Sequence, residues 1–124
     1  MIESLDVVVH GHPRPQGSMI SLGRGRPVVA SNREVLHPWR DAITAEVMKR
    51  TGGKLLWSRG VALRADLVFV LPQPASSRYP EPSGRVGDLD KLVRAALDAV
   101  TASRAWQDDS QVLELTARKC YPAA

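Results

Sequence analysis

The segment "LDKLVRAALDAV", residues 89–100, constrains the fold more than any other stretch of this chain. Its apolar residues recur at i, i+3, i+4, i+7, i+8 and i+11, which is the spacing of one face of a helix. These residues are Leu89, Leu92, Val93, Ala96, Leu97 and Val100. Because a helix with one apolar face must bury it against another element, the rest of the chain has to supply a covering core.

Four other segments are predicted to supply that core. Residues 4–10, "SLDVVVH", predict a strand, and residues 60–72, in which apolar side chains alternate, predict a long central strand. Residues 37–50, "HPWRDAITAEVMKR", predict a helix that begins next to Pro38, because proline suits the first helical turn. Residues 111–119, "QVLELTARK", predict a closing strand.

Two segments rich in glycine and proline separate these elements. In residues 11–33, "SMISL" and "PVVAS" flank "GRGR", which predicts a β-hairpin or an irregular loop. Residues 72–87 contain four prolines and two glycines, and a loop this long in a compact domain is usually functional or disordered. The element order predicts a single α+β domain over residues 1–124, with a mixed β-sheet of about four or five strands and two main helices.

The positive charge is concentrated in the first half of the chain. The 17 Lys and Arg residues exceed the 13 Asp and Glu residues, and residues 1–60, with nine basic and five acidic residues, carry the whole net charge of +4. Residues 11–33 contain no acid and four arginines, namely Arg14, Arg24, Arg26 and Arg33. Each alone could be an ordinary surface residue, but together they predict an arm that contacts DNA phosphates. The other candidate DNA contacts are Arg78, Arg85 and Lys91.

The cellular compartment is predicted from what the chain lacks. A lone cysteine, Cys120, allows no disulfide within the chain and fits a reducing compartment. The N-terminal residues lack the basic and apolar regions of a secretory signal, and no window reaches the roughly 18 apolar residues of a membrane helix. We therefore expect a cytoplasmic protein with no membrane partner.

Acidic residues gather in two places: Asp88 and Asp90 lie where the helix over 89–100 starts, and Asp108 and Asp109 lie in the turn before the last strand. A structural role explains part of this pattern. Aspartate is a favoured N-cap, acids suit the positive end of a helix dipole, and turns favour aspartate. One cap is enough for one helix, so capping does not explain both Asp88 and Asp90.

The same acids could instead hold a metal ion. Asp88 and Asp90 can converge only if the helix begins near them, with Asp88 still extended or at the cap. A third carboxylate, from Asp108 or Asp109, could complete the cluster, and a cation would keep the neighbouring carboxylates ionised. Oxygen ligands favour Mg²⁺ or Mn²⁺, and carboxylate-bound Mg²⁺ beside a basic surface suits phosphodiester hydrolysis. The alternative for Asp90 is a surface ion pair with Arg94, four residues later.

Residues 87–112, "GDLDKLVRAALDAVTASRAWQDDSQV", resemble the core motif of the RusA family of Holliday junction resolvases. The family pattern D-L-D-N-L-x-K-A is followed, after a short gap, by D-D-x-Q-V, and the pairing of the two halves makes the resemblance specific. The segment "WRDAI" and the Gly/Pro-rich segment after the first predicted strand extend it loosely. The chain departs from the pattern at Lys91, where the family has asparagine, and at Arg94, where it has lysine.

The resemblance implies a homodimeric, Mg²⁺-dependent endodeoxyribonuclease that resolves Holliday junctions in DNA recombination and repair. It implies paired symmetric nicks with 5′-phosphate ends, and Mn²⁺ can substitute for Mg²⁺. The catalytic and metal-binding residues would be Asp88, Asp90 and Asp109, so the family pattern favours Asp109 over Asp108. Arg94, a further candidate catalytic residue, or Lys91 would stabilise the developing negative charge.

Three alternative functions fit the same residues. The first is a nuclease of the same fold that prefers flaps, forks or other branched DNA. The second is a non-catalytic DNA-binding module, in which the acids are only caps and turn residues. The third is a hydrolase of small phosphate esters, which the arginine-rich arm and the positive net charge disfavour.

Overall fold

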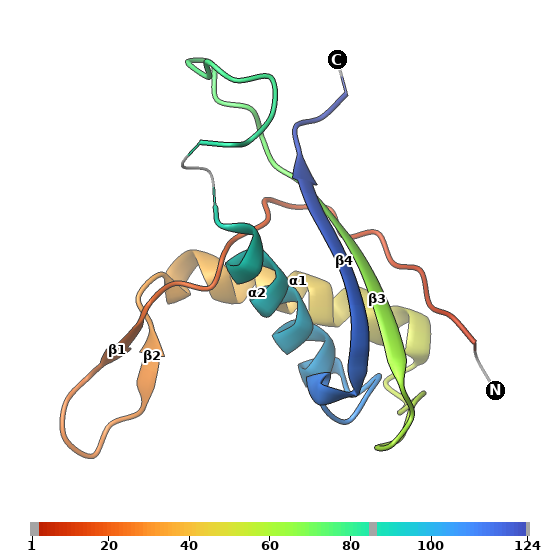
Figure 1. Ribbon diagram of the computed structural model, residues 1–124. Coiled ribbons are helices and arrows are strands. Elements are labelled where there is room, and N and C mark those ends of the chain that lie inside the picture. Colours follow the sequence, from red (N-terminus) through yellow and green to blue (C-terminus); the bar gives the residue numbers. More distant parts are fainter. Residues whose placement is uncertain (1–2, 85–86, 124) are drawn as a thin grey trace.

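A computed structural model describes residues 3–84 and 87–123 of the chain. The elements in chain order are β1 (Met19–Ser21), β2 (Val28–Ala30), α1 (Arg33–Thr51), β3 (Leu63–Val70), α2 (Leu89–Ser103), the short 3-10 helix η1 (Asp109–Gln111) and β4 (Val112–Cys120). The two long helices pack together against one face of the β3–β4 sheet (Figure 1). The predicted α+β fold with two main helices is therefore confirmed. Neither of these two described helices is sufficiently long and apolar to cross a membrane.

The described strands form two separate two-stranded sheets, whereas the sequence predicts one mixed sheet. β1 and β2 pair antiparallel as the predicted hairpin, and β3 and β4 pair in parallel through a crossover that contains α2. Residues 4–10 pair with no other described strand, so the strand prediction there is wrong. Leu5, Val7 and Val9 still pack against the core, while Val8 is 68% exposed. The apolar pattern identifies the buried side chains, but pairing also needs a partner edge that the local sequence does not specify.

The first long helix begins at Arg33, four residues before its predicted start, so Pro38 lies inside it. This position is tolerated because a proline near the helix start removes only one of the backbone hydrogen bonds. Trp39, Ile43 and Val47 form the buried face of α1. The Thr44 hydroxyl donates to a backbone carbonyl of α2 at 2.9 Å, which ties the two helices together.

The helix predicted over 89–100 is α2, and it extends to Ser103. Its buried residues include Leu92 and Val93 as predicted, and also Ala95, which the predicted apolar face omits. The buried face is wider than predicted because α2 is covered from two sides. The main core covers one side, and a small cluster of Ala30, Leu36 and Ala95, at the base of the hairpin, covers the other.

The outer face of the β3–β4 sheet carries a cross-strand link. Asp66 accepts hydrogen bonds from the Thr116 hydroxyl of β4 and from the Arg64 guanidinium, and these lower the pKa of its carboxyl group, with the Thr116 bond as the larger cause. Val68 and Val70 lie farther along β3 on the same outer face, and they are 63% and 46% exposed.

Replacing Asp66 with alanine is expected to lower the melting temperature at pH 7, because the ionised carboxylate is stabilised in the folded state. A carboxyl group with a lowered pKa contributes stability above its unfolded-state pKa, which is about 4, and loses it as the pH falls through the folded value. The difference in melting temperature between the wild type and Asp66→Ala should therefore shrink as the pH is lowered to about 3. Thermal denaturation followed by circular dichroism at both pH values would measure this. An equal difference at both values would contradict the explanation.

Candidate active site

Asp88 stands at the N-cap of α2, but its carboxylate does not cap the helix. The backbone there is extended, with φ −74° and ψ 134°, and no hydrogen bond joins the side chain to the first turn. The side chain is 73% exposed, and its partner is Lys91, whose Nζ lies 3.8 Å from Asp88 Oδ2. Capping therefore does not account for this acid. The extended backbone at Asp88, followed at once by the helix, is the geometry that a site shared with Asp90 requires.

Asp90 lies in the first turn of α2 and is exposed. The ion pairs found among the described residues do not join it to Arg94, which is also exposed. The surface ion pair, which is the structural alternative for Asp90, is therefore not formed. Two carboxylates two residues apart are left facing solvent at the start of one helix.

One backbone conformation and two hydrogen bonds, none of them predicted from the sequence, hold this helix start in place. Gly87 has φ +115°, a left-handed conformation that favours glycine. Its carbonyl accepts a hydrogen bond from Lys119 Nζ at 2.8 Å, which ties the start of α2 to the end of β4. The backbone N–H of Gln16 donates to the backbone carbonyl of Lys91 at 3.0 Å, which ties the segment before the hairpin to the same helical turn. The backbone carrying Asp88 is thus fixed from two sides.

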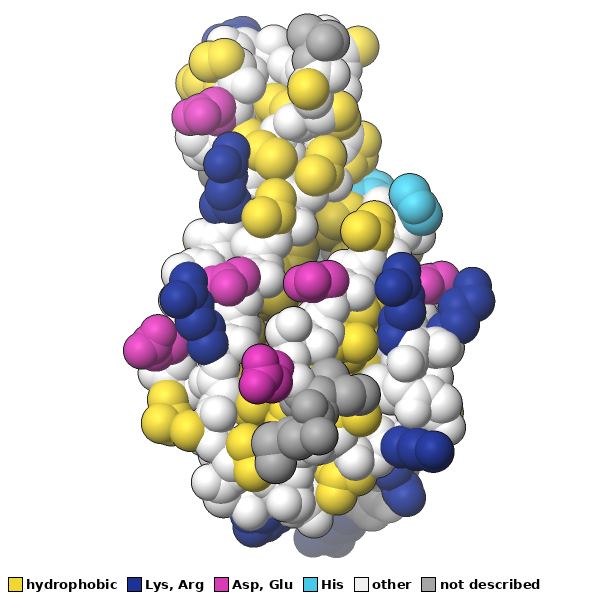
Figure 2. Space-filling view, turned by 90° about the vertical axis from the view of Figure 1, so that its right-hand side faces the viewer, with side chains coloured by type: hydrophobic (Ala, Val, Ile, Leu, Met, Phe, Trp, Pro, Cys, Tyr) yellow, Lys and Arg dark blue, Asp and Glu magenta, His cyan; other side chains and the backbone are white. Residues whose placement is uncertain are grey.

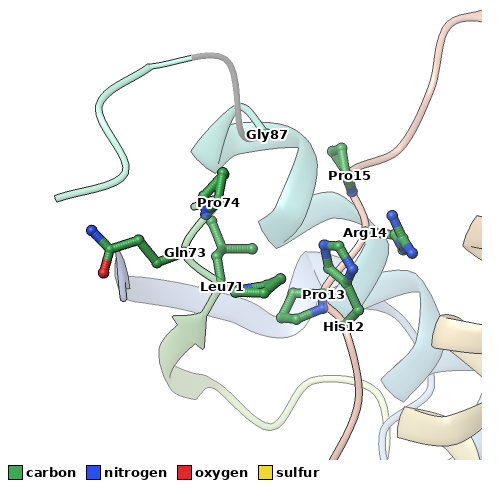
Figure 3. A pocket seen from close by; sticks show the side chains of 9 residues that line it. His12, Pro13, Arg14, Pro15, Leu71, Gln73, Pro74 and Gly87 are labelled. Atoms are coloured by element: carbon green, nitrogen blue, oxygen red, sulfur yellow. The ribbon is translucent and has the colours of Figure 1, made fainter. Parts of the chain in front are cut away.

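A groove of about 420 Å³ reaches Gly87, the residue that precedes Asp88 in the chain. Its walls are His12–Pro15 on one side and the segment leaving β3, Leu71–Pro74, on the other, and Gly87 lines the end next to α2 (Figure 3). Arg14, one of the predicted DNA contacts, lines the groove. Burial and the neighbouring Arg14 guanidinium lower the pKa of His12, so its ring is largely neutral at pH 7.

Asp109 lies at the other end of α2. The 15 residues of this helix span about 22 Å, since each adds about 1.5 Å. β4 returns over a similar length, because Val112 follows the Asp109 turn while Lys119 contacts Gly87. Among the described residues, no three His, Cys, Asp or Glu side chains gather where a metal ion could bind. One chain therefore brings Asp88 and Asp90 together but leaves Asp109 apart from them.

The two acids of the turn before β4 have different surroundings. Asp108 accepts a hydrogen bond from the Ser110 hydroxyl at 2.5 Å, and this bond is the main cause of the lowered pKa of its carboxyl group. No hydrogen bond or ion pair engages the Asp109 carboxylate among the residues described. Asp108 thus has a structural role in the turn, and Asp109 is free to take a ligand.

Gln111, the glutamine of the D-D-x-Q-V motif, has a structural role that was not predicted from the sequence. This side chain is buried, and its Nε2 lies 3.0 to 3.3 Å from the carbonyls of Trp57, Ser58 and Val61. Its Oε1 accepts the backbone N–H groups of Gln107 and Asp108 at 2.9 and 3.0 Å. Gln111 therefore joins the segment before β3 to the turn that holds Asp109. The only sequence signal was the glutamine of the motif itself, and its burial cannot be read without the fold.

The predicted DNA contacts are spread over several elements. Arg24 and Arg26 are exposed in the β1–β2 hairpin, Arg33 begins α1, and Arg78 is exposed in the loop after β3, whereas Arg85 lies outside the described residues. Figure 2 shows the face on the opposite side from the hairpin, and both acidic and basic side chains lie across its middle. That face is therefore not a uniformly basic DNA-binding surface.

Comparison with known proteins identifies the family. The model of the endodeoxyribonuclease RusA family matches residues 11–124, which include the hairpin, both long helices and all the acids discussed above. No curated protein matches the chain. A family match over nearly the whole chain supports a nuclease that acts on DNA junctions, and the chain belongs to the RusA family of endodeoxyribonucleases.

Proposed function

We propose that this protein is a divalent-metal-dependent endonuclease that resolves four-way DNA junctions by paired symmetric nicks, leaving 5′-phosphate ends. The observation that carries the proposal is the pair Asp88 and Asp90, two exposed carboxylates at one helix start, in a chain of the RusA family. Neither the cap of α2 nor an ion pair with Arg94 accounts for them.

The donor atoms of this pair fit Mg²⁺, with Mn²⁺ as a substitute. Both ions prefer oxygen ligands, and Mg²⁺ is commonly held by one or two carboxylates together with water and substrate phosphates. Asp88 and Asp90 supply two such carboxylates, both open to solvent.

A second copy of the chain would supply the third carboxylate. Asp109 is about one helix length, roughly 22 Å, from Asp88 in its own chain, whereas a ligand oxygen must lie about 2.1 Å from Mg²⁺. A two-fold dimer that sets the start of one α2 against the end of the other would bring Asp109 of the partner subunit to Asp88 and Asp90. Two-fold symmetry would then create two equal sites, as paired nicking of two strands requires.

The chain's own residues then have distinct roles. Asp88 and Asp90 would bind and orient the metal ion, which when bound supplies an acidified water and neutralises charge at the phosphate. Lys91, 3.8 Å from Asp88, and Arg94, on the next turn of α2, would hold the scissile phosphate and stabilise its developing charge. Arg14 in the adjoining groove would guide the DNA strand towards the acids.

The proposal is tested by cleavage of end-labelled DNA. A four-way junction, a flap, a fork and a linear duplex of the same sequence are incubated with the protein in Mg²⁺, in Mn²⁺ and in EDTA. We expect symmetric nicks in the junction, with either metal and not with EDTA. Faster cutting of the flap or fork would favour the branched-DNA nuclease, and junction binding without cutting in either metal would favour the non-catalytic binding module.

A further inference from the structure

The β1–β2 hairpin projects from the body of the protein. Residues 22–27 connect its two short strands at the far end, and the whole element stands away from the β3–β4 sheet (Figure 1). From Ser18, where the hairpin is closed by a backbone hydrogen bond from Ser31, the chain can reach about 20 Å to the tip, since an extended residue adds about 3.3 Å. A projection of this length is longer than the major groove of DNA is deep, about 8.5 Å.

The hairpin exposes apolar side chains along its strands. Met19 is 50% exposed, Ile20 39% and Val28 57%. Ser21, opposite Val28, is exposed as well. The register places Met19 and Val28 on one face of the hairpin and Ile20 on the other, so the strands present apolar side chains on both faces.

The tip of the hairpin is basic. Arg24 and Arg26 lie in a tight turn in which Gly23 and Gly25 both have left-handed backbones and the Arg26 amide donates to the Gly23 carbonyl at 3.1 Å. Residues 11–33 contain no acid that would neutralise these arginines. The surface that receives the hairpin is therefore expected to be anionic and also to offer apolar faces, a combination that stacked and unstacked nucleobases provide.

The base of the hairpin is firmly anchored next to the candidate active site. The Asn32 side chain accepts from the Gly17 amide and donates to the Pro15 carbonyl, both at 2.8 Å. A Cβ at Gly17 would come within 2.2 Å of Asn32 Oδ1, so this close approach requires glycine. Ala30 shares a small buried cluster with Leu36 and with Ala95 of α2, the helix whose first turn carries Asp90. The base of the hairpin is therefore linked to the helix that bears the acids.

We propose that the hairpin is a pin that enters the branch point of the DNA junction. Ile20, Val28 and Met19 insert against bases that lose their stacking partners there, while Arg24 and Arg26 hold the flanking phosphates. Insertion of apolar side chains between base steps is an established way for proteins to unstack and bend DNA. The inference rests on the proposed junction-cleaving function, because it assigns how the substrate of that site is opened.

The test uses Ile20→Ser/Val28→Ser, with Val68→Ser/Val70→Ser as the control. The control removes two valines of similar exposure from the outer face of β3, which has no part in the proposed site. Each protein is prepared on an Asp90→Asn background and mixed with a four-way junction that carries 2-aminopurine at the branch point. Fluorescence then reports base unstacking without cleavage. Cleavage is measured separately with the same pairs of substitutions in the otherwise unaltered protein.

We expect the unaltered hairpin and the control to raise 2-aminopurine fluorescence, and Ile20→Ser/Val28→Ser to abolish the rise. Junction binding by this variant should stay within about threefold, because the arginines that neutralise phosphate remain, while cleavage falls about tenfold or more, because the junction is not opened. The proposal is overturned if fluorescence rises equally with the variant. It is also overturned if fluorescence never rises although the wild type cleaves the junction. Failure of the wild type to bind or cut any branched DNA would instead overturn the proposed function.

Sedimentation of the same variants separates the pin from a dimer contact. If the apolar strands of the hairpin packed on a second copy, Ile20→Ser/Val28→Ser would shift the protein towards monomer at concentrations where the control remains a dimer. That result would overturn the proposal. An unchanged oligomeric state together with the loss of fluorescence supports it.

Discussion

Asp90→Asn is expected to reduce junction cleavage by more than about a hundredfold, because even the loss of groups that only orient metal ligands costs about 10- to 100-fold. Binding of the junction should be retained or slightly strengthened, since the substitution removes a negative charge that faces the DNA phosphates. The melting temperature should hardly change, because Asp90 is exposed and is not in the ion pairs found among the described residues. Cleavage rates, a binding titration and thermal denaturation give the three values.

The matched control is Asp98→Asn, which makes the same charge change on the same helix two turns later. It should leave the cleavage rate within a factor of about two, because surface substitutions away from a site have small effects. Equal losses with both variants would mean that the net charge, rather than a ligand, is responsible. Full activity of Asp90→Asn would remove this residue from the metal site.

Gln111→Ala is expected to have the largest effect on stability, lowering the free energy of unfolding by roughly 3 kcal/mol, because a buried hydrogen-bonded network loses its centre. The substitution leaves the amides of Gln107 and Asp108 and the carbonyls of the segment before β3 without their partner. Urea denaturation would measure the change. Cleavage at a temperature where the variant is folded should also fall, because the turn that holds Asp109 loses its support.

Gln107→Ala provides the comparison for Gln111→Ala. Gln107 is the exposed glutamine of the same turn, and its side chain accepts one hydrogen bond, from the Arg59 amide. Its loss should cost less than about 1 kcal/mol, as expected for one exposed hydrogen bond. A similar cost for the two variants would show that burial of Gln111 adds nothing to its contribution.

The parts of the fold that were predictable are those that a local pattern specifies. The apolar period of α2 identified much of its buried face, and the glycine before Asp88 together with the helix after it indicated a helix start near Asp88, which is observed. The tight turn flanked by "SMISL" and "PVVAS" predicted the hairpin. In each case neighbouring residues along the chain determine the structure, so the sequence alone is sufficient.

The missed features depend on contacts between distant segments. Residues 4–10 have the composition of a strand, but a strand also needs a free edge in register, which the rest of the fold determines. The role of Gln111 depends on carbonyls 50 to 54 positions earlier in the chain. The position of Asp109 depends on the length of α2, which carries the chain away from Asp88 before β4 begins. A cluster of three acids in one chain was therefore the natural prediction from the motif, and the described residues do not form it.

Mixing two inactive variants tests the central claim most directly, namely that each site combines Asp88 and Asp90 of one copy with Asp109 of the partner subunit. Asp90→Asn and Asp109→Asn are allowed to exchange subunits, and nicking of the four-way junction is measured. If the claim is right, a mixed dimer has one site with both substitutions and one with neither, so nicking of one strand returns. If all three acids act within one copy, both sites of the mixed dimer remain defective, and the absence of any recovery would contradict the account.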